Sequence, residues 1–384
     1  MMRLTRPSFL SQTCRNFTRG FATKAPTAVV MMNMGGPATL DQVGFFLNNL
    51  FSDPEIIKLG PLQNTLGPYI AKRRTPKIIE QYDQIGGGSP IGKWTDVQGK
   101  AMTDLLDKLS PDTAPHKHYT AFRYAHPLTE QAVDEMVADG VTRAVAFSEY
   151  PHWSCTTTGS SMNHLNRTLE AKGLSDQIKW SVVDRWPLAP GFIQAVAERI
   201  VEALPQFEGK EAPTILFSAH SLPQYVVSRG DPYANEIAAT SYAVMKKLEK
   251  EFNQDLAHMI SWQSKVGFLP WLSPSTSGTL AELGKRGKKS VLVVPIAFTS
   301  DHIETLFEID IEYREEAEAV GIENFHKTEG LNASKTLIQT KADLVLESLT
   351  GGKNSASLQY PIRCVECANP DICRPKLNPA FPEA

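Results

Sequence analysis

The chain of 384 residues alternates short apolar runs with longer segments of helical period along most of its length. We expect strands at 27–34, 118–124, 143–150, 179–184, 213–220, 258–264 and 290–298, and a shorter one near Phe325. Strands that alternate with helices form parallel sheets covered by helices on both faces. The runs fall into two sets of four. The sequence therefore predicts an α/β protein with two similar doubly wound, Rossmann-like domains around a central cleft.

Proline residues mark the change from one predicted domain to the next. Pro187 and Pro190 lie in "RWPLAPG", between the two sets of strands. We therefore place a first α/β domain at 25–189 and a second at 190–330. A helix and a cysteine-rich tail at 331–384 then close the chain.

The first 24 residues differ from the rest of the chain. They contain five basic residues and no acidic one, the first acid being Asp41. This composition is typical of a mitochondrial transit peptide, and the alternative is a disordered basic tail. Without residues 1–24 the formal net charge falls from -3 to about -8, so we expect no nucleic-acid partner. No apolar run approaches the roughly 18–20 residues of a membrane span, so we expect no integral membrane segment.

Four cysteines remain after this segment. Three lie in "CVECANPDIC", and the set comprises Cys155, Cys364, Cys367 and Cys373. In a reducing compartment, clustered thiols bind metal more often than they form disulfides. Four thiolates complete the shell of a zinc ion or of a [2Fe–2S] cluster, and the spacing does not choose between them. The alternative is a loose tail with free thiols.

Two histidines follow predicted strands of the second domain. His220 lies in "SAHSLP" and His302 in "AFTSDHIE". In doubly wound sheets, ligands bind beyond the carboxyl ends of the strands, so both are candidates for proton transfer or metal binding. Each could instead be a structural cap. The chain lacks a glycine fingerprint for nucleotides and a G-x-S-x-G elbow, which disfavours nucleotide enzymes and hydrolases.

An acidic segment follows His302. On a helix, one side of this segment would carry Asp301, Glu304, Glu308 and Glu315, with Glu312 and Glu316 on its flank. The row could be an ordinary solvated face. Its start at the end of a buried strand favours a functional row. His302 and Glu304 would face different ways on a regular helix, so joint use of both predicts a local irregularity such as a π-bulge.

Other residues at the strand ends suggest a flat, acidic ligand. The apolar ones are Met34, Trp271 and Phe298, and the basic ones are Arg74, Arg123 and Arg229. Taken singly, each could serve packing or a surface ion pair. Together they outline a site for a large planar molecule with carboxylates.

The segment 43–76 is rich in Phe, Leu and Ile and ends in "AKRRTP". Such a segment can rest on a membrane face through its apolar side chains and basic anchors. The alternative is a pair of helices that lines the cleft.

The sequence resembles ferrochelatase over nearly all of the chain after residue 24. The motifs that carry the resemblance are "NMGGP", "AKRRTP", "QYDQIGGGSPI", "FRYAHPLTE", "YPHWSCTTTGSS", "DRWP", "ILFSAHSLP", "RGDPY", "WQSKVG", "PWLSPST" and "AFTSDHIETLFEIDIEY". The resemblance implies a lyase that inserts Fe²⁺ into protoporphyrin IX to form protohaem. It also implies peripheral association with the matrix side of the inner mitochondrial membrane, as a homodimer.

The resemblance also implies roles for single residues. His220 and Glu304 would face each other across the porphyrin, His302 would complete the insertion centre, and Glu308 and Glu312 would continue an acidic path. A weaker match assigns Asp343 to the active site. The porphyrin-contacting positions would be Met34, Arg74, Tyr82, Ser89, Arg123, Tyr124, Trp271 and Phe298. The four cysteines Cys155, Cys364, Cys367 and Cys373 would bind a [2Fe–2S] cluster.

Three rival functions remain open at this point. A related chelatase could insert another metal into a different tetrapyrrole. A carrier could bind a tetrapyrrole without metallating it. A structural α/β protein could hold zinc at its four cysteines.

Overall fold

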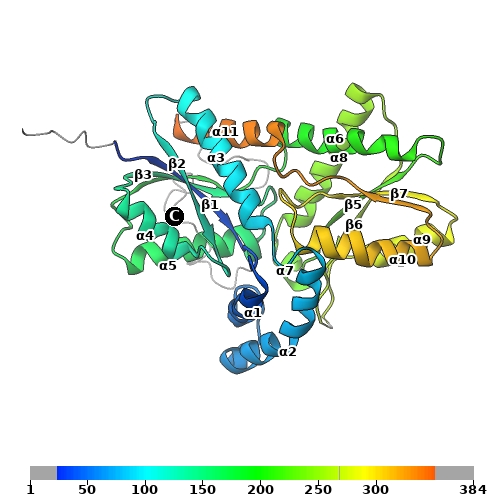
Figure 1. The fold of residues 1–384 in the computed structure, drawn as a ribbon, viewed down its shortest axis with the longest axis horizontal. Helices are drawn as coiled ribbons and strands as arrows, with labels where there is room; N and C mark the ends of the chain where they lie inside the picture. The colour runs from blue at the N-terminus through cyan, green and yellow to red at the C-terminus, as the bar shows by residue number, and fades with distance from the viewer. Residues whose placement is uncertain (1–23, 268, 351–384) are drawn as a thin grey trace, which may run out of the picture.

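The computed structural model describes residues 24–267 and 269–350 and contains two four-stranded parallel sheets (Figure 1). The first sheet holds β1 (Thr27–Asn33), β2 (His116–Phe122), β3 (Arg143–Ser148) and β4 (Lys179–Val183). The second holds β5 (Thr214–His220), β6 (His258–Gln263), β7 (Ser290–Pro295) and β8 (Asn324–Lys327). The predicted transit segment up to residue 23 and the three tail cysteines lie outside the described residues.

Helices connect the strands and cover the sheets. The α-helices are α1 (Val43–Ser52), α2 (Gln63–Gln84), α3 (Ile91–Leu109), α4 (Thr129–Ala138), α5 (Ser160–Ala171), α6 (Pro190–Ala203), α7 (Gln224–Ser228), α8 (Tyr233–Phe252), α9 (Thr276–Lys285), α10 (Arg314–Ala319) and α11 (Lys335–Leu349). Two segments are π-helical, Cys155–Gly159 and Glu304–Tyr313. Short 3₁₀ turns lie at Leu40–Gln42, Gly60–Leu62 and Leu204–Phe207.

The two sheets repeat one winding. Their strand orders are β2-β1-β3-β4 and β6-β5-β7-β8, so the second strand of each set lies outside the first, and the third and fourth follow on the other side. All neighbouring strands in both sheets pair in parallel. This arrangement confirms the predicted fold of two similar α/β units. The predicted range 25–189 contains β1–β4, and 190–330 contains β5–β8.

Most of the strands end earlier than the apolar pattern predicts. The run predicted at 290–298 forms a strand only to Pro295, which has no backbone N–H to extend the ladder. The chain then turns and reaches the second π-helix at Glu304. The residues released from the strand, including Phe298, become part of the loop at the carboxyl edge of the sheet.

One hydrophobic core joins the two halves. It contains Met31 of β1 and Phe147 of β3 from the first sheet together with Phe217 of β5 and Val294 of β7 from the second. Helices α6 and α11 contribute buried side chains to the same core, and α11 packs against both α3 and α6 (Figure 1). The C-terminal helix therefore returns to the first half of the chain, because its apolar face closes the layer that both sheets share.

Helices α1 and α2 form a hairpin that projects from the two sheets, at the bottom of Figure 1. We call this hairpin, Val43–Gln84, the lip. Val43, Leu47 and Phe51 of α1 pack against Ala71 and Tyr82 of α2. Gly67 allows the close approach, because a Cβ at this position would lie 2.7 Å from the carbonyl oxygen of Phe51. The segment expected at 43–76 is thus a pair of packed helices that continues beyond residue 76.

Candidate functional site

His220 and Glu304 meet at the carboxyl edge of the second sheet. His220 is the last residue of β5, and Glu304 opens the π-helix that follows β7, the neighbour of β5. The Nδ1 atom of His220 lies 3.0 Å from Oε2 of Glu304. The two side chains are 36% and 25% exposed, so the pair is reachable from solvent.

The direct contact differs from the arrangement that the resemblance implies. That arrangement places a porphyrin between His220 and Glu304, whereas here the two side chains share a hydrogen bond. The parallel pairing of β5 and β7 brings the end of β5 close to the segment that follows β7, and the opposite charges of the two side chains attract.

His302 joins the same group. Its Nδ1 hydrogen-bonds the carbonyl oxygen of Ser300 at 3.1 Å, and its Nε2 lies 3.9 Å from Oε2 of Glu304. The ring of Phe298 packs against the imidazole with centroids 4.5 Å apart. His302 lies in the loop before the helix, so the helical period does not separate it from Glu304, and the segment that follows is π-helical. The expected helix irregularity is therefore confirmed.

Each member of the pair shifts the pKa of the other. Burial alone lowers the pKa of His220, but the charge and hydrogen bond of Glu304, with Glu308 beyond it, raise this pKa above its ordinary value. Burial alone raises the pKa of Glu304, but His220 and His302 outweigh it and hold this pKa well below the usual range. The pairing therefore favours the protonated form of His220 and the ionised form of Glu304.

Glu308 lies one turn further along the π-helix in a cradle of donors. Its carboxylate accepts hydrogen bonds from the backbone N–H of Ser264 at 2.7 Å, from the Tyr313 hydroxyl at 2.7 Å and from Nε2 of Gln263 at 3.2 Å. The Ser264 hydroxyl donates as well. Burial and the nearby charge of Glu304 raise the pKa of Glu308 despite these bonds.

The sequence did not single out Gln263, Ser264 and Tyr313. Gln263 is the last residue of β6, the strand paired with β5, and its register partner is His220. The polar "WQSK" at the end of an apolar run was the available signal, since strand ends meet at one edge of a parallel sheet.

Glu312 follows Glu308 at the same spacing and is half-buried. Burial and the charge of Glu308 raise its pKa. Glu315 and Glu316 are exposed. Glu304, Glu308 and Glu312 are thus half-buried, whereas Glu315 and Glu316 beyond them are solvated.

Asp301 does not belong to this row, which corrects the helical count. Its carboxylate accepts hydrogen bonds from Thr305 Oγ1 at 2.8 Å and Asn332 Nδ2 at 2.6 Å, and Lys327 Nζ lies 3.6 Å away. Asp301 precedes the helix, so the helical period does not apply to it. It fastens the loop after β7 to the chain after β8.

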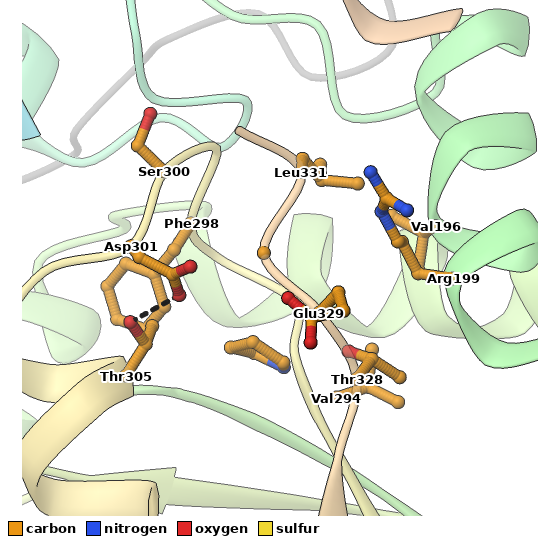
Figure 2. A pocket seen from close by; sticks show the side chains of 12 residues that line it. Val196, Arg199, Val294, Phe298, Ser300, Asp301, Thr305, Thr328, Glu329 and Leu331 are labelled. Atoms are coloured by element: carbon orange, nitrogen blue, oxygen red, sulfur yellow. Dashed lines mark hydrogen bonds between the residues drawn. The ribbon is translucent and has the colours of Figure 1, made fainter. Parts of the chain in front are cut away.

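Figure 2 shows a small pocket beside this loop. Asp301 and Thr305 line it together with Val196 and Arg199 of α6. His220, His302 and Glu304 are absent from its lining, so they lie outside this pocket.

Two of the expected ligand contacts, Trp271 and Tyr82, lie near the pair. The Trp271 ring lies edge-on to the His220 ring with centroids 6.4 Å apart. The Tyr82 hydroxyl has a raised pKa through burial and through the charge of Glu304, which places it close to that carboxylate. Met34 follows β1 and is half-buried, and its N–H donates to the Tyr150 hydroxyl at 2.7 Å.

Other expected contacts have partners within the protein. The Arg74 guanidinium lies 5.5 Å from the centroid of the Phe51 ring. The Ser89 hydroxyl accepts a hydrogen bond from the N–H of Ile91 at 3.4 Å, at the start of α3. Arg229 lies over the ring of Tyr225 at 5.2 Å.

Arg123 and Tyr124 both bind Asp53. The guanidinium and the hydroxyl each approach Oδ2 of Asp53 to 2.6 Å. Asp53 caps the end of α1, so these bonds hold the base of the lip. Tyr124 is only 1% exposed. The structure therefore places the polar ends of both side chains against the lip, a contact that spans about 70 residues and that no local pattern reveals.

Asp343 lies apart from the pair. It is exposed on α11, where its carboxylate accepts a hydrogen bond from Gln339 at 2.8 Å. The buried face of α11 carries Leu337, Lys341 and Val345 instead. The structure does not bring Asp343 to His220 and Glu304, because it points away from the shared core.

The ferrochelatase family model matches residues 26–349. The chain is 52% identical over 363 residues to the mitochondrial ferrochelatase of Schizosaccharomyces pombe, covering 94% of this chain and 84% of that one. It is 51% identical over 354 residues to the mitochondrial ferrochelatase of Gallus gallus, covering 91% and 86%. The corresponding protein of Homo sapiens is 50% identical, with 91% and 82% covered.

The chain belongs to the ferrochelatase family. Cys155, the one predicted cluster ligand among the described residues, begins the first π-helical turn, after β3. It is half-buried, and Asp231 accepts its backbone N–H at 2.7 Å. The described residues contain no group of three or more His, Cys, Asp or Glu side chains placed to hold a metal ion.

Replacing Glu304 with Gln should lower the pKa of His220, because the amide keeps the shape but removes the charge that raises this pKa. An opposite charge at this distance shifts a pKa by about 1–3 units, so we expect a fall of at least about one unit. NMR titration of the histidine Cε1–H signals measures it, with His220→Asn for assignment.

Glu315→Gln is the matched control, since Glu315 is exposed on the helix that continues from the same segment. It should leave the His220 titration in place. A His220 pKa that is equal in wild type and Glu304→Gln contradicts the assignment. Pairing with Glu304 favours protonated His220 in the folded state. The stability that the pair contributes is therefore complete at pH values below the pKa of an unfolded histidine. It is lost as the pH rises through the raised pKa of His220.

Proposed function

We propose that this protein inserts Fe²⁺ into protoporphyrin IX to form protohaem in the mitochondrion, the last step of haem biosynthesis. Membership of the ferrochelatase family supports the reaction, and the names of the relatives support the location. The observation in the fold that carries the proposal is the His220–Glu304 pair at the carboxyl edge of the second sheet. Fe²⁺ and the porphyrin are the substrates.

The reaction requires proton removal from a rigid ring. Protoporphyrin holds two protons on its central nitrogens, and both must leave as the metal binds four nitrogens. A planar ring presents these lone pairs poorly to a hydrated ion. Binding of the rest of the macrocycle can supply the energy that distorts the ring and exposes the nitrogens.

His220 is the proposed base. Glu304 accepts the hydrogen bond from Nδ1, so neutral His220 carries its proton on Nδ1 and presents a lone pair at Nε2. Nε2 accepts a pyrrole proton, and the imidazolium that forms stays paired with Glu304. The raised pKa of His220 makes it a stronger base than an ordinary histidine. Glu304 thus orients the base and stabilises its charged product.

The carboxylate row offers a route for ions. Glu308 and Glu312 have raised pKa values, and both are half-buried like Glu304. Carboxyl groups with raised pKa values exchange protons closer to neutral pH than ordinary ones. We assign them to proton removal or to passage of the incoming cation. His302 lies beside Glu304 and completes the centre.

Ligand contacts follow from the same geometry. We propose that Met34, Tyr82, Trp271 and Phe298 contact the macrocycle near the pair. Arg74, Ser89, Arg123 and Tyr124 are proposed to shape the lip side of the site. Asp343 is proposed to act through Gln339 and α11 rather than by contact with the porphyrin or the metal.

Replacing His220 with Ala should lower the rate of iron insertion by about 100-fold or more, because the general base is lost. Binding of protoporphyrin should stay close to that of the wild type. Both are measured anaerobically by protoporphyrin fluorescence, with and without Fe²⁺. His258→Ala is the control, since His258 is exposed at the opposite end of the neighbouring strand β6. Near-normal turnover by His220→Ala contradicts the proposed role.

The lip is proposed to rest on the inner mitochondrial membrane. Leu62 and Tyr69 are 56% and 57% exposed, and Phe45 is 40% exposed on the facing helix. Lys72 and Arg73 follow one turn later and are exposed. Exposed apolar side chains beside basic ones suit an anionic membrane surface. No helix among the described residues is long and apolar enough to cross a membrane.

Replacing both Leu62 and Tyr69 with Ser should reduce vesicle binding by about 10-fold or more, since each buried side chain contributes about 1.5–3 kcal/mol. Sedimentation with vesicles of phosphatidylcholine and cardiolipin measures it. Tyr242→Ser is the control, because Tyr242 is 62% exposed on α8, outside the lip. Equal binding by the lip variant and the wild type contradicts this surface.

The four cysteines are proposed to bind a [2Fe–2S] cluster. Cys155 fits this role, since it is a half-buried thiol at the start of a turn whose backbone Asp231 holds in place. Cys364, Cys367 and Cys373 would supply the remaining ligands. A bound cluster supplies one-electron redox chemistry and would link the tail to the loop after β3.

Cys155→Ser should remove the red-brown colour of the purified protein, because a cluster with three thiolates is labile. Visible absorption and iron analysis measure the change. Ser161→Ala, at a buried position of α5, is the control and should keep the colour. A colourless wild type that contains zinc contradicts the cluster. We also propose a homodimer, on family resemblance alone.

A further inference from the structure

A buried ion pair lies where the two halves of the protein meet. Lys341 of α11 is fully buried, and its ammonium contacts the carboxylate of Glu149, which follows β3 and is 1% exposed at its side chain. The ammonium also lies 5.7 Å from the centroid of the Phe147 ring. Removing charges from water costs free energy, so the fully buried position of this ion pair indicates a specific role.

Lys341 also sets the orientation of the Gln98 side-chain amide. It donates to Oε1 of Gln98, a fully buried residue of α3. An ammonium can only donate, so it orients the Gln98 amide with its oxygen toward Lys341 and its NH₂ group away. An apolar residue at 341 would allow the amide to flip.

The NH₂ group of Gln98 then faces the other half of the protein. It donates to the carbonyl oxygen of Thr299 at 3.1 Å, to Oγ of Ser300 at 3.1 Å and to the carbonyl oxygen of Asn332 at 2.7 Å. The Thr299 hydroxyl in turn donates to the carbonyl oxygen of Glu149 at 3.3 Å. All these acceptors except Glu149 belong to the second half of the chain.

The turn held by Gln98 carries the site histidine. The carbonyl oxygen of Ser300 binds Nδ1 of His302, which leaves Nε2 facing Glu304 at 3.9 Å. Asn332, the third acceptor, clasps Asp301 between Ser300 and His302 through two hydrogen bonds of 2.9 and 2.6 Å. A continuous chain of contacts therefore runs from Lys341 to the imidazole of His302.

We propose that Lys341 and Glu149 are positioning residues: their buried pair, acting through Gln98, fixes the Thr299–Ser300 turn and thereby the direction of the His302 imidazole. Neither residue touches His302, Glu304 or His220. The inference concerns the geometry of the proposed insertion centre and so rests on the proposed function for its effect on rate. Its effect on His302 itself does not depend on that function.

The test removes both charges at once. Lys341→Met alone strands a buried carboxylate, whereas Lys341→Met with Glu149→Gln leaves no buried charge and keeps similar volumes. We expect the double variant to unfold near the temperature of the wild type. Its kcat should fall about 10-fold with KM for protoporphyrin nearly unchanged, as for a displaced catalytic group. Its His302 Cε1–H NMR signal should shift from the position in the wild type.

Two further variants keep the test decisive. Gln98→Glu stays paired with Lys341 but loses the NH₂ donors, so it should reproduce the lower kcat and the shifted His302 signal even where the double variant fails to fold. Lys335→Met, an exposed lysine of the same helix, should change neither readout.

The outcomes separate the two proposals. A folded double variant or Gln98→Glu with wild-type kcat and an unmoved His302 signal overturns the positioning role. A wild-type protein that inserts no iron overturns the proposed function, and the His302 signal then still tests the positioning role.

Discussion

The parallel pairing of β5 and β7 is the constraint on which the site depends. Both strands end at one edge of the second sheet, so His220 at the end of β5 and Glu304 beyond β7 come within hydrogen-bonding distance across 84 residues of sequence. Antiparallel neighbours would place these ends at opposite edges of the sheet. His302 reaches the same group because it lies in the loop before the π-helix, where the helical period does not separate it from Glu304.

Charge is distributed unevenly along the acidic row. Glu304 holds its negative charge strongly between two histidines, whereas Glu308 and Glu312 have raised pKa values because each is partly buried beside another carboxylate. A proton that leaves His220 therefore finds two carboxylates beyond Glu304 that bind protons more readily than ordinary ones.

Much of the fold could be predicted from local patterns. Each of the eight apolar runs forms a strand, because period and β-propensity act over a few residues. Histidines at strand ends were predictable site candidates for the same reason. Asp301 was assigned to the wrong group, since its partner Asn332 lies 31 residues away. Arg123 and Tyr124 are held by Asp53 at the end of α1. Asp343 faces solvent because the opposite face of α11 closes the core.

The sequence by itself determined the order of strands and helices, the two-unit α/β architecture and the polar residues at the strand ends. Those features rest on interactions between residues close in the chain. Only the tertiary structure decided which partner each charged group takes. Glu304 meets His220, Asp53 meets Arg123, and Glu149 meets Lys341 across 192 residues. A charge is stabilised by whatever lies within a few ångströms of it, and packing of the sheets and helices sets that neighbourhood.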